Sequence, residues 1–322
     1  MVNKMNKLTK QIIIILSVVL IFVFIDLMIY NVVTKRYIND TSEGMIAKSI
    51  ELDKYLPFVE NSEIVKIEAD KKITGDLPVI DGAAALYPIF SSFVNSLYTK
   101  EDVIFDGTNF TNESKLHYTN TRGAYKAIVD KEADIVFCVS PSDEQLQYAK
   151  ENNVELEFIP IGYEAFVFIV NKDNPINSLT QDQIRKIYSG EFINWKSVGG
   201  DNNFIDALQR NKGSGSQSAM ENFMGDKEMK RNVLGIFGRS IGFSFRYYVE
   251  GIVENGKVKM IAVDGVYPNK ENIKNKTYPI VNELYAVVRK DDPNPNIKLF
   301  IDFVLSEKGQ RIVEESGYVS IK

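Results

Sequence analysis

An apolar segment from Ile12 to Val33 constrains this chain more than any other feature, because so few polar groups interrupt it. Its 22 residues would span roughly 33 Å as an α-helix, which is enough to cross the hydrocarbon core of a membrane. A cleaved signal peptide would have a shorter apolar region followed by small residues, and no Ala-x-Ala follows this one. The segment 12–33 therefore predicts an uncleaved transmembrane signal anchor.

Basic residues flank both ends of this segment, so charge alone does not fix its orientation. Lys4, Lys7 and Lys10 precede it, and Lys35 and Arg36 follow it. A first segment with a short basic tail usually keeps that tail in the cytoplasm. We expect residues 1–11 to form a cytoplasmic tail, and the remainder to lie outside the cell membrane, which the chain crosses once.

Composition excludes several classes of function. The formal net charge is −5, whereas nucleic-acid-binding proteins usually have a basic surplus. His117 and Cys138 are the only histidine and cysteine in the chain, so thiolate metal sites and histidine-based triads are poorly supported. We expect no nucleic-acid partner, no metal, no cofactor and no enzymatic activity.

The rest of the chain has the pattern of an α/β protein. Residues 34–76 mix charges with short apolar pairs, which predicts a stalk or linker with one helical piece and a strand at its end. From Leu77 onward, strand-like and helix-like stretches alternate. The stretches 160–175 and 279–295 resemble each other in having Pro-Ile, a Glu at the fifth position and an apolar strand. They indicate either two strands that bracket an inserted lobe or two ordinary buried strands.

Residues 209–220 read QRNKGSGSQSAM and precede a helical pattern. The first turn of a helix has unsatisfied N–H groups and a partial positive charge, and glycine lets a ligand approach the backbone. An anion here would receive hydrogen bonds from Ser214, Gly215 and Ser216, and Arg210 would add a charged donor. A Walker loop is excluded because the required Gly-Lys-Ser/Thr is missing. From the pattern alone, an ordinary flexible loop remains the alternative.

Several motifs together resemble the phosphate-type solute-binding proteins of bacterial ABC transporters. They are DGAAALYP, RGAYKAIVDKEADIVF, IYSGEFINWKSVGG and QRNKGSGSQ, and the resemblance covers roughly residues 76–322. It implies an α/β, type II periplasmic-binding-protein fold, in which two lobes joined by a two-strand hinge close on a ligand. The implied divisions are a first lobe at 77–165, a second lobe at 166–280, and a return to the first lobe at 281–322.

The resemblance also implies a ligand site. The positions that match the family's anion contacts are Ala85, Leu86, Thr121, Arg210, Ser214, Gly215 and Ser216. The first loop normally carries a Ser or Thr but here contains Ala83–Ala85, so only its N–H groups could donate. The family's phosphate binders also have a carboxylate that accepts the proton of hydrogen phosphate, and Cys138, Val139 and Ser140 occupy that region here. Lys212 stands where an acidic partner of the arginine is common, and Arg246 could add a second guanidinium or instead pair with Glu250.

These features favour a monomeric, membrane-tethered binding protein for an oxyanion, with phosphate as the first candidate and an ABC transporter permease as its partner. A tethered sensor or scaffold with a degenerate anion pocket is the alternative. A hydrolase that uses Ser214 or Ser216 would need His117 as its base and is the least supported hypothesis.

Overall fold

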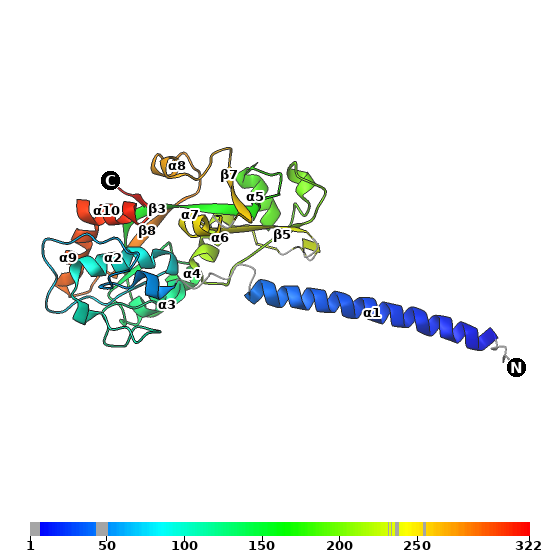
Figure 1. The fold of residues 1–322 in the computed structure, drawn as a ribbon, viewed down its shortest axis with the longest axis horizontal. Coiled ribbons are helices and arrows are strands. Elements are labelled where there is room, and N and C mark those ends of the chain that lie inside the picture. The colour runs from blue at the N-terminus through cyan, green and yellow to red at the C-terminus, as the bar shows by residue number, and fades with distance from the viewer. Residues whose placement is uncertain (1–6, 43–50, 231, 233, 236–237, 254–255) are drawn as a thin grey trace. The chain divides into compact units, whose positions relative to one another are not determined.

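The computed structural model describes residues 7–42, 51–230, 232, 234–235, 238–253 and 256–322 (Figure 1). The chain divides into residues 1–46 and residues 47–322, and each unit is described by itself.

The first unit contains one long helix, α1 (Lys7–Ser42). Within it, Thr9–Tyr30 has a mean hydropathy of 3.3 over 22 residues, and it is the one stretch of the described residues that is long and apolar enough to cross a membrane. This stretch overlaps most of the predicted segment 12–33. The helix continues to Ser42, so the beginning of the predicted stalk is helical.

The second unit is built on a mixed sheet. Its path is β1-β2-β8-β3-β6-β5, with β7 and β9 also paired to β3 and with β4 paired to β7. The strands are β1 (Ile80–Gly82), β2 (Ile135–Cys138), β3 (Leu156–Asn171), β4 (Ser178–Leu179), β5 (Ile205–Ala207), β6 (Arg239–Phe245), β7 (Val258–Val263), β8 (Val281–Arg289) and β9 (Val319–Ser320).

The long strand β3 connects the two halves of this sheet. Its residues 156–165 pair antiparallel with β8, and its residues 166–170 pair antiparallel with β6. The partner changes between Ala165 and Phe166, and β8 begins at Val281 beside Ala165. The two resembling stretches are therefore neighbouring strands. The change falls where the sequence predicts the lobe boundaries, and the closing of two lobes stays a prediction.

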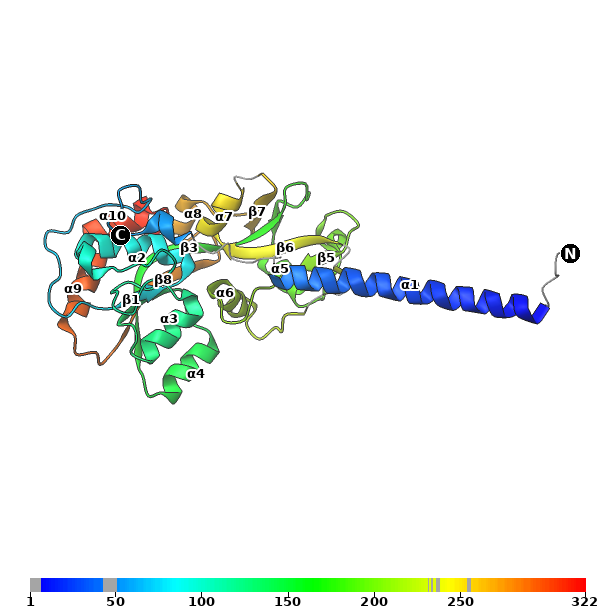
Figure 2. The same cartoon turned by 60° about the horizontal axis from the view of Figure 1, so that its bottom comes forward.

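Helices cover both faces of the half-sheet formed by β1, β2 and β8 (Figure 2). Phe90, Phe93 and Phe300 belong to the larger core on the face covered by α2 and α9, whereas Ala124 and Ala149 belong to a smaller core beneath α3 and α4. The helices are α2 (Tyr87–Leu97), α3 (Asn120–Val129), α4 (Asp143–Glu151), α5 (Gln181–Tyr188), α6 (Gly215–Met224), α7 (Arg246–Val253), α8 (Lys270–Lys274), α9 (Pro295–Val304) and α10 (Glu307–Glu315).

Residues 51–76 do not form the stalk and strand that the sequence predicts. They contain a short 3-10 turn, η1 (Leu52–Tyr55), and otherwise run irregularly along α2. The amide of Phe58 donates to Asn95 Oδ1 at 2.9 Å, and the amide of Val65 donates to Ser92 Oγ at 3.1 Å. The segment docks because its apolar side chains cover the core, Ile73 being buried and Tyr55 partly buried.

Candidate functional site

The start of α6 has the geometry that the glycine-serine loop predicts. Ser214 is its N-cap and accepts a hydrogen bond from the amide of Gln217 at 3.3 Å. The side-chain oxygen of Gln217 accepts from the amide of Arg210 at 2.9 Å, which closes the loop. The amides of Gly215 and Ser216 form no hydrogen bond with the described residues. Two donors in the positive first turn of a helix are therefore open to an anion.

Glycine is required at two positions of this loop. Gly213 has φ +79°, a left-handed conformation that side chains disfavour. A Cβ atom on Gly215 would lie 3.0 Å from Thr121 Oγ1 and 3.1 Å from Val139 Cγ2. The start of α6 therefore lies directly against the start of α3 and the residue that follows β2. Thr121 and Gly215 are neighbours, and that both contact an anion stays a prediction.

A buried carboxylate holds the start of α3 in place. Asp81, at the centre of β1, accepts from the amide of Thr119 at 2.9 Å and from its hydroxyl at 2.5 Å. Burial raises the pKa of Asp81, and hydrogen bonds from Thr119 and Gly82 oppose the shift. Asn120 then takes φ +62° and accepts from the amide of Arg122 at 3.1 Å. These contacts leave Thr121 buried beside the α6 loop.

Arg210 supplies a positive charge to this region. It is half-buried and forms no ion pair with any residue that the structure describes. Burial lowers the pKa of the Arg210 guanidinium, and the nearby hydroxyl of Tyr248 opposes that shift. An arginine remains protonated through such a shift, so the group is a desolvated cation for which an anion is the natural partner.

The first predicted loop is only partly as expected. Residues Ala84–Leu86 form a 3-10 turn, η2, in which the amide of Leu86 donates to Ala83 O at 2.9 Å. The prediction that Leu86 donates to a ligand is therefore wrong, because the turn itself uses that N–H group. The carbonyl of Ala85 accepts from the Tyr318 hydroxyl, and its amide has no recorded partner among the described residues. No recorded contact joins Ala85 to the α6 loop.

The suggestion that Arg246 reaches the ligand needs correction. Its side chain is 2% exposed and pairs with Glu164 at 3.2 Å and with Glu250. It also donates to Gly317 O at 2.7 Å. Burial raises the pKa of Glu164 to about 7, and the Arg246 charge opposes this shift. With these partners Arg246 ties β3 to the start of α7 and is a structural residue.

Lys212 pairs with a carboxylate of another helix. Its ammonium group is exposed and lies 3.2 Å from the Glu144 carboxylate of α4. A pair as exposed as this contributes less than about 1 kcal/mol. The expected extra positive charge is therefore largely balanced by Glu144, and the pair joins the α6 loop to α4.

Two residues beside the predicted set were not assigned to it from the sequence. The place where the family has an acceptor carboxylate is occupied by Val139, whose side chain lies next to Gly215. Tyr248, which lies near Arg210, follows Arg210 by many residues and comes from α7. The adjacent tyrosines in FRYYVEG were the available signal, but nothing in that pattern indicates which ring faces the arginine.

This arrangement brings Thr121 next to the start of α6, which contains Ser214, Gly215 and Ser216. The amide of Arg210 is tied to Gln217 of the same helix, and that its guanidinium reaches a bound anion stays a prediction. The described side chains in recorded contact with Gly215 include no carboxylate. Such a donor-rich, partly buried region favours a small anion. The single histidine of the chain, His117, is not among the described side chains that contact Gly215.

Comparison with known proteins gives a consistent picture. A family model described as a PBP superfamily domain matches residues 78–308. The chain is 31% identical over 180 residues to the phosphate-binding protein PstS of Borreliella burgdorferi, a match that spans 50% of this chain and 64% of that protein. These findings confirm the resemblance to phosphate-type solute-binding proteins that the motifs indicate.

Solved structures share the fold. A putative phosphate ABC transporter substrate-binding protein with bound phosphate from Clostridium perfringens superposes with a TM-score of 0.58 at 25% identity, covering 76% of this chain and 98% of that one. An ABC-type phosphate transport receptor from Vibrio cholerae superposes with a TM-score of 0.55 at 21% identity, covering 74% of this chain and 98% of that one. Both matches confirm the predicted α/β fold class.

Proposed function

The chain belongs to the family of PBP superfamily domains, and on that premise we propose that it is a solute-binding protein that captures an inorganic oxyanion, phosphate in the first place. The relatives named above bind phosphate according to their names. One observation carries the proposal for this chain: the amides of Gly215 and Ser216, at the start of α6, have no hydrogen-bond partner among the described residues and lie beside Thr121. The same loop carries Arg210, which is half-buried and has no carboxylate partner among those residues. Binding of this kind requires no covalent chemistry.

The proposed site residues are Thr121, Arg210, Ser214, Gly215 and Ser216, with Ala85 as a further backbone donor. Amide and hydroxyl donors stabilise an oxyanion without changing protonation, and the guanidinium adds charge-assisted hydrogen bonds. Ser214 also caps α6, so its oxygen is already an acceptor for Gln217, while its proton remains free to donate.

A panel of ligands tests this function. Thermal unfolding of the full-length protein in detergent is followed with phosphate, sulfate and acetate in a phosphate-free buffer. Phosphate at a hundred times its Kd should stabilise the fold by about 2.7 kcal/mol, which raises the midpoint measurably. If none of the three anions shifts the midpoint, the oxyanion-binding function is wrong, and the tethered sensor or scaffold with a degenerate pocket becomes the better hypothesis.

We further propose that α1 anchors the protein in the cell membrane, with residues 1–11 in the cytoplasm and residues 47–322 outside. Delivery of the anion to an ABC transporter permease by a monomer completes this proposal. The apolar stretch Thr9–Tyr30 supports the anchor.

Labelling of introduced cysteines tests the topology, because the native Cys138 is buried. A membrane-impermeant maleimide applied to intact cells should modify the exposed variant Lys196→Cys and should leave Asn3→Cys unmodified until the cells are opened. The reverse pattern would contradict the orientation.

A further inference from the structure

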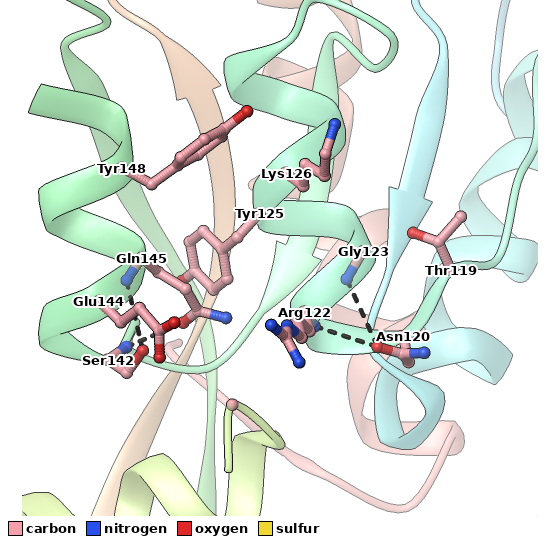
Figure 3. Close-up of a pocket in the computed structure, with 11 residues that line it drawn as sticks. Thr119, Asn120, Arg122, Gly123, Tyr125, Lys126, Ser142, Glu144, Gln145 and Tyr148 are labelled. Carbon is pink, nitrogen blue, oxygen red and sulfur yellow. Dashed lines mark hydrogen bonds between the residues drawn. The ribbon is translucent and has the colours of Figure 1, made fainter. Parts of the chain in front are cut away.

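Three turns carry the hydrogen-bond donors of the proposed anion site, and two of them are held by their own polar side chains. At the start of α6, the amide of Gln217 donates to Ser214 Oγ at 3.3 Å. At the start of α3, Asn120 Oδ1 accepts from the amides of Arg122 at 3.1 Å and of Gly123 at 3.4 Å (Figure 3). Both turns therefore keep their shape through side chains that belong to them.

The third turn, η2, has no polar side chain of its own. Residues 83–85 are all alanine, and no side chain among the described residues caps the start of η2. An alanine side chain neither donates nor accepts a hydrogen bond, so a side chain that orients this turn has to come from elsewhere in the chain. Ala85 is partly exposed, and its amide, without a recorded partner among the described residues, is the donor of this turn that is available to an anion.

The turn η2 lies beside the other two turns. It immediately precedes Tyr87, the first residue of α2, and the Tyr87 ring contacts the ring of Tyr118, just before α3, with centroids 5.7 Å apart. The start of α3 in turn contacts the start of α6, where Thr121 is next to Gly215. The three turns therefore follow one another in space without a gap in the recorded contacts.

Tyr318 supplies the side chain that holds η2. Its hydroxyl donates to the carbonyl oxygen of Ala85, and its ring is buried. Only φ and ψ of Ala85 separate this fixed carbonyl from the Ala85 amide, so the contact restricts the direction in which the amide points. Tyr318 itself precedes β9, in which Val319 pairs with Tyr163 of β3. The contact therefore ties η2 to the central strand of the sheet.

The first turn of α7 holds the Tyr318 ring in place. The Tyr247 ring packs on it with ring centroids 4.6 Å apart. Gly317, which precedes Tyr318, has φ +97°, and a Cβ atom there would lie 2.8 Å from the Tyr247 ring. Arg246 donates to the carbonyl of Gly317 at 2.7 Å. Two neighbouring residues of α7 thus fix the two residues in front of β9.

Resting on the proposed oxyanion-binding function, we infer that Tyr318 is a positioning residue of the anion site. It acts on the anion only through Ala85, whose carbonyl it holds so that the Ala85 amide donates to the anion. The Tyr247 ring keeps Tyr318 in the position that this contact requires.

Calorimetry of phosphate with the full-length protein in detergent tests this role by comparing Tyr318→Phe with Tyr278→Phe. Tyr278 is the matched control, because it is also buried and its hydroxyl also donates to a backbone carbonyl, that of Phe166, at 2.9 Å. Each variant loses one such hydrogen bond and should unfold at a lower urea concentration than wild type. Only Tyr318→Phe should bind phosphate more weakly, by about tenfold, as expected when one hydrogen bond to a charged group is lost.

Hydrogen exchange of the Ala85 amide supplies a readout that a loss of stability alone would not move. Saturating phosphate should slow this exchange in wild type and in Tyr278→Phe, and it should not slow it in Tyr318→Phe. A second variant, Tyr247→Leu, keeps the Tyr318 hydroxyl but removes the ring that packs on it. It should also weaken phosphate binding.

The outcomes separate this inference from the proposed function. If wild type binds phosphate and Tyr318→Phe binds it equally tightly, or if phosphate slows the Ala85 exchange equally in both, the inference is overturned and the proposed function stands. Unchanged affinity in Tyr247→Leu removes Tyr247 from the positioning role, and it overturns the whole inference if Tyr318→Phe does not fold. If wild type binds no phosphate, the proposed function itself fails.

Discussion

Gly215 shows how closely the proposed site depends on single atoms. A side chain there would meet both Thr121 Oγ1 and Val139 Cγ2 within 3.1 Å. We predict that Gly215→Ala separates the starts of α6 and α3 and lowers phosphate affinity at least tenfold. The separation should also destabilise the fold by about 1–3 kcal/mol. Calorimetry and urea unfolding measure the two effects.

Ser218→Ala is the matched control for Gly215→Ala. Ser218 lies in the same helix and is fully buried, and its hydroxyl has no partner among the residues that the structure describes. Its removal should leave phosphate affinity unchanged. Equal affinities of Gly215→Ala and Ser218→Ala would show that the contact between the two helix starts does not matter for binding.

The buried pair of Glu164 and Arg246 makes stability depend on pH. The pKa of Glu164 rises from 4.5 to about 7 in the folded protein, so the folded state binds this proton more tightly than the unfolded state does. Glu164 therefore stabilises the fold most at pH values below 4.5, and this stabilisation is lost as the pH rises through 7. The free energy of unfolding of the wild type, relative to Glu164→Gln, should therefore fall by about 3 kcal/mol between pH 4.5 and pH 8.

Urea unfolding at several pH values measures this difference, and the fluorescence of the single buried tryptophan, Trp195, reports it. Glu101→Gln, at an exposed position, is the control and should show no comparable change with pH. A difference between wild type and Glu164→Gln that stays constant with pH would contradict the raised pKa.

At the scale of elements, the segment 51–76 belongs to the folded unit. Ile64 and Ile73 are buried in it, and each such side chain contributes about 1.5–3 kcal/mol. A chain that begins at residue 77 should therefore be at least about 3 kcal/mol less stable than one that begins at residue 47. Denaturant unfolding of the two chains measures this, and equal stabilities would mean that the segment is only loosely attached.

The elements that the sequence predicts well have local signals. The helix at 181–188 has a Ser/Thr start and a Gly stop, and its capping box between Thr180 and Gln183 is present in the structure. The segment 51–76 was misread because its partners, Ser92 and Asn95 on α2, lie far along the chain. No periodic pattern in the segment itself predicts these hydrogen bonds to α2.

In the candidate site, too, some features follow from the local sequence and others depend on contacts between distant parts of the chain. The start of α6 follows from Gly213 to Ser216 in the sequence, because glycines and a capping serine specify that geometry locally. The partner of the Leu86 amide could not be predicted from the sequence, because it depends on whether residues 84–86 form a 3-10 turn. The partners of Arg246 come from β3 and from the residue before Tyr318, and only the folded sheet brings them together.

At the scale of the whole molecule, β3 and β8 are the shared strands through which the two halves of the sheet are connected. The proposed binding residues come from both sides of that connection, with Thr121 from the part before it and Arg210 with the α6 loop from the part after it. If the two parts close on a ligand as predicted, a ligand that bridges them would stabilise that closed arrangement, since it makes its contacts only when both parts are in place.

The central claim is that Arg210 and the start of α6 hold a small oxyanion. Titration calorimetry of phosphate into the full-length protein in detergent tests it with two variants, Arg210→Ala and Lys212→Ala. Wild type and Lys212→Ala should bind one phosphate with similar affinity, and Arg210→Ala should lose about 2–5 kcal/mol of binding free energy. Phosphate binding that is unchanged in Arg210→Ala would contradict the account.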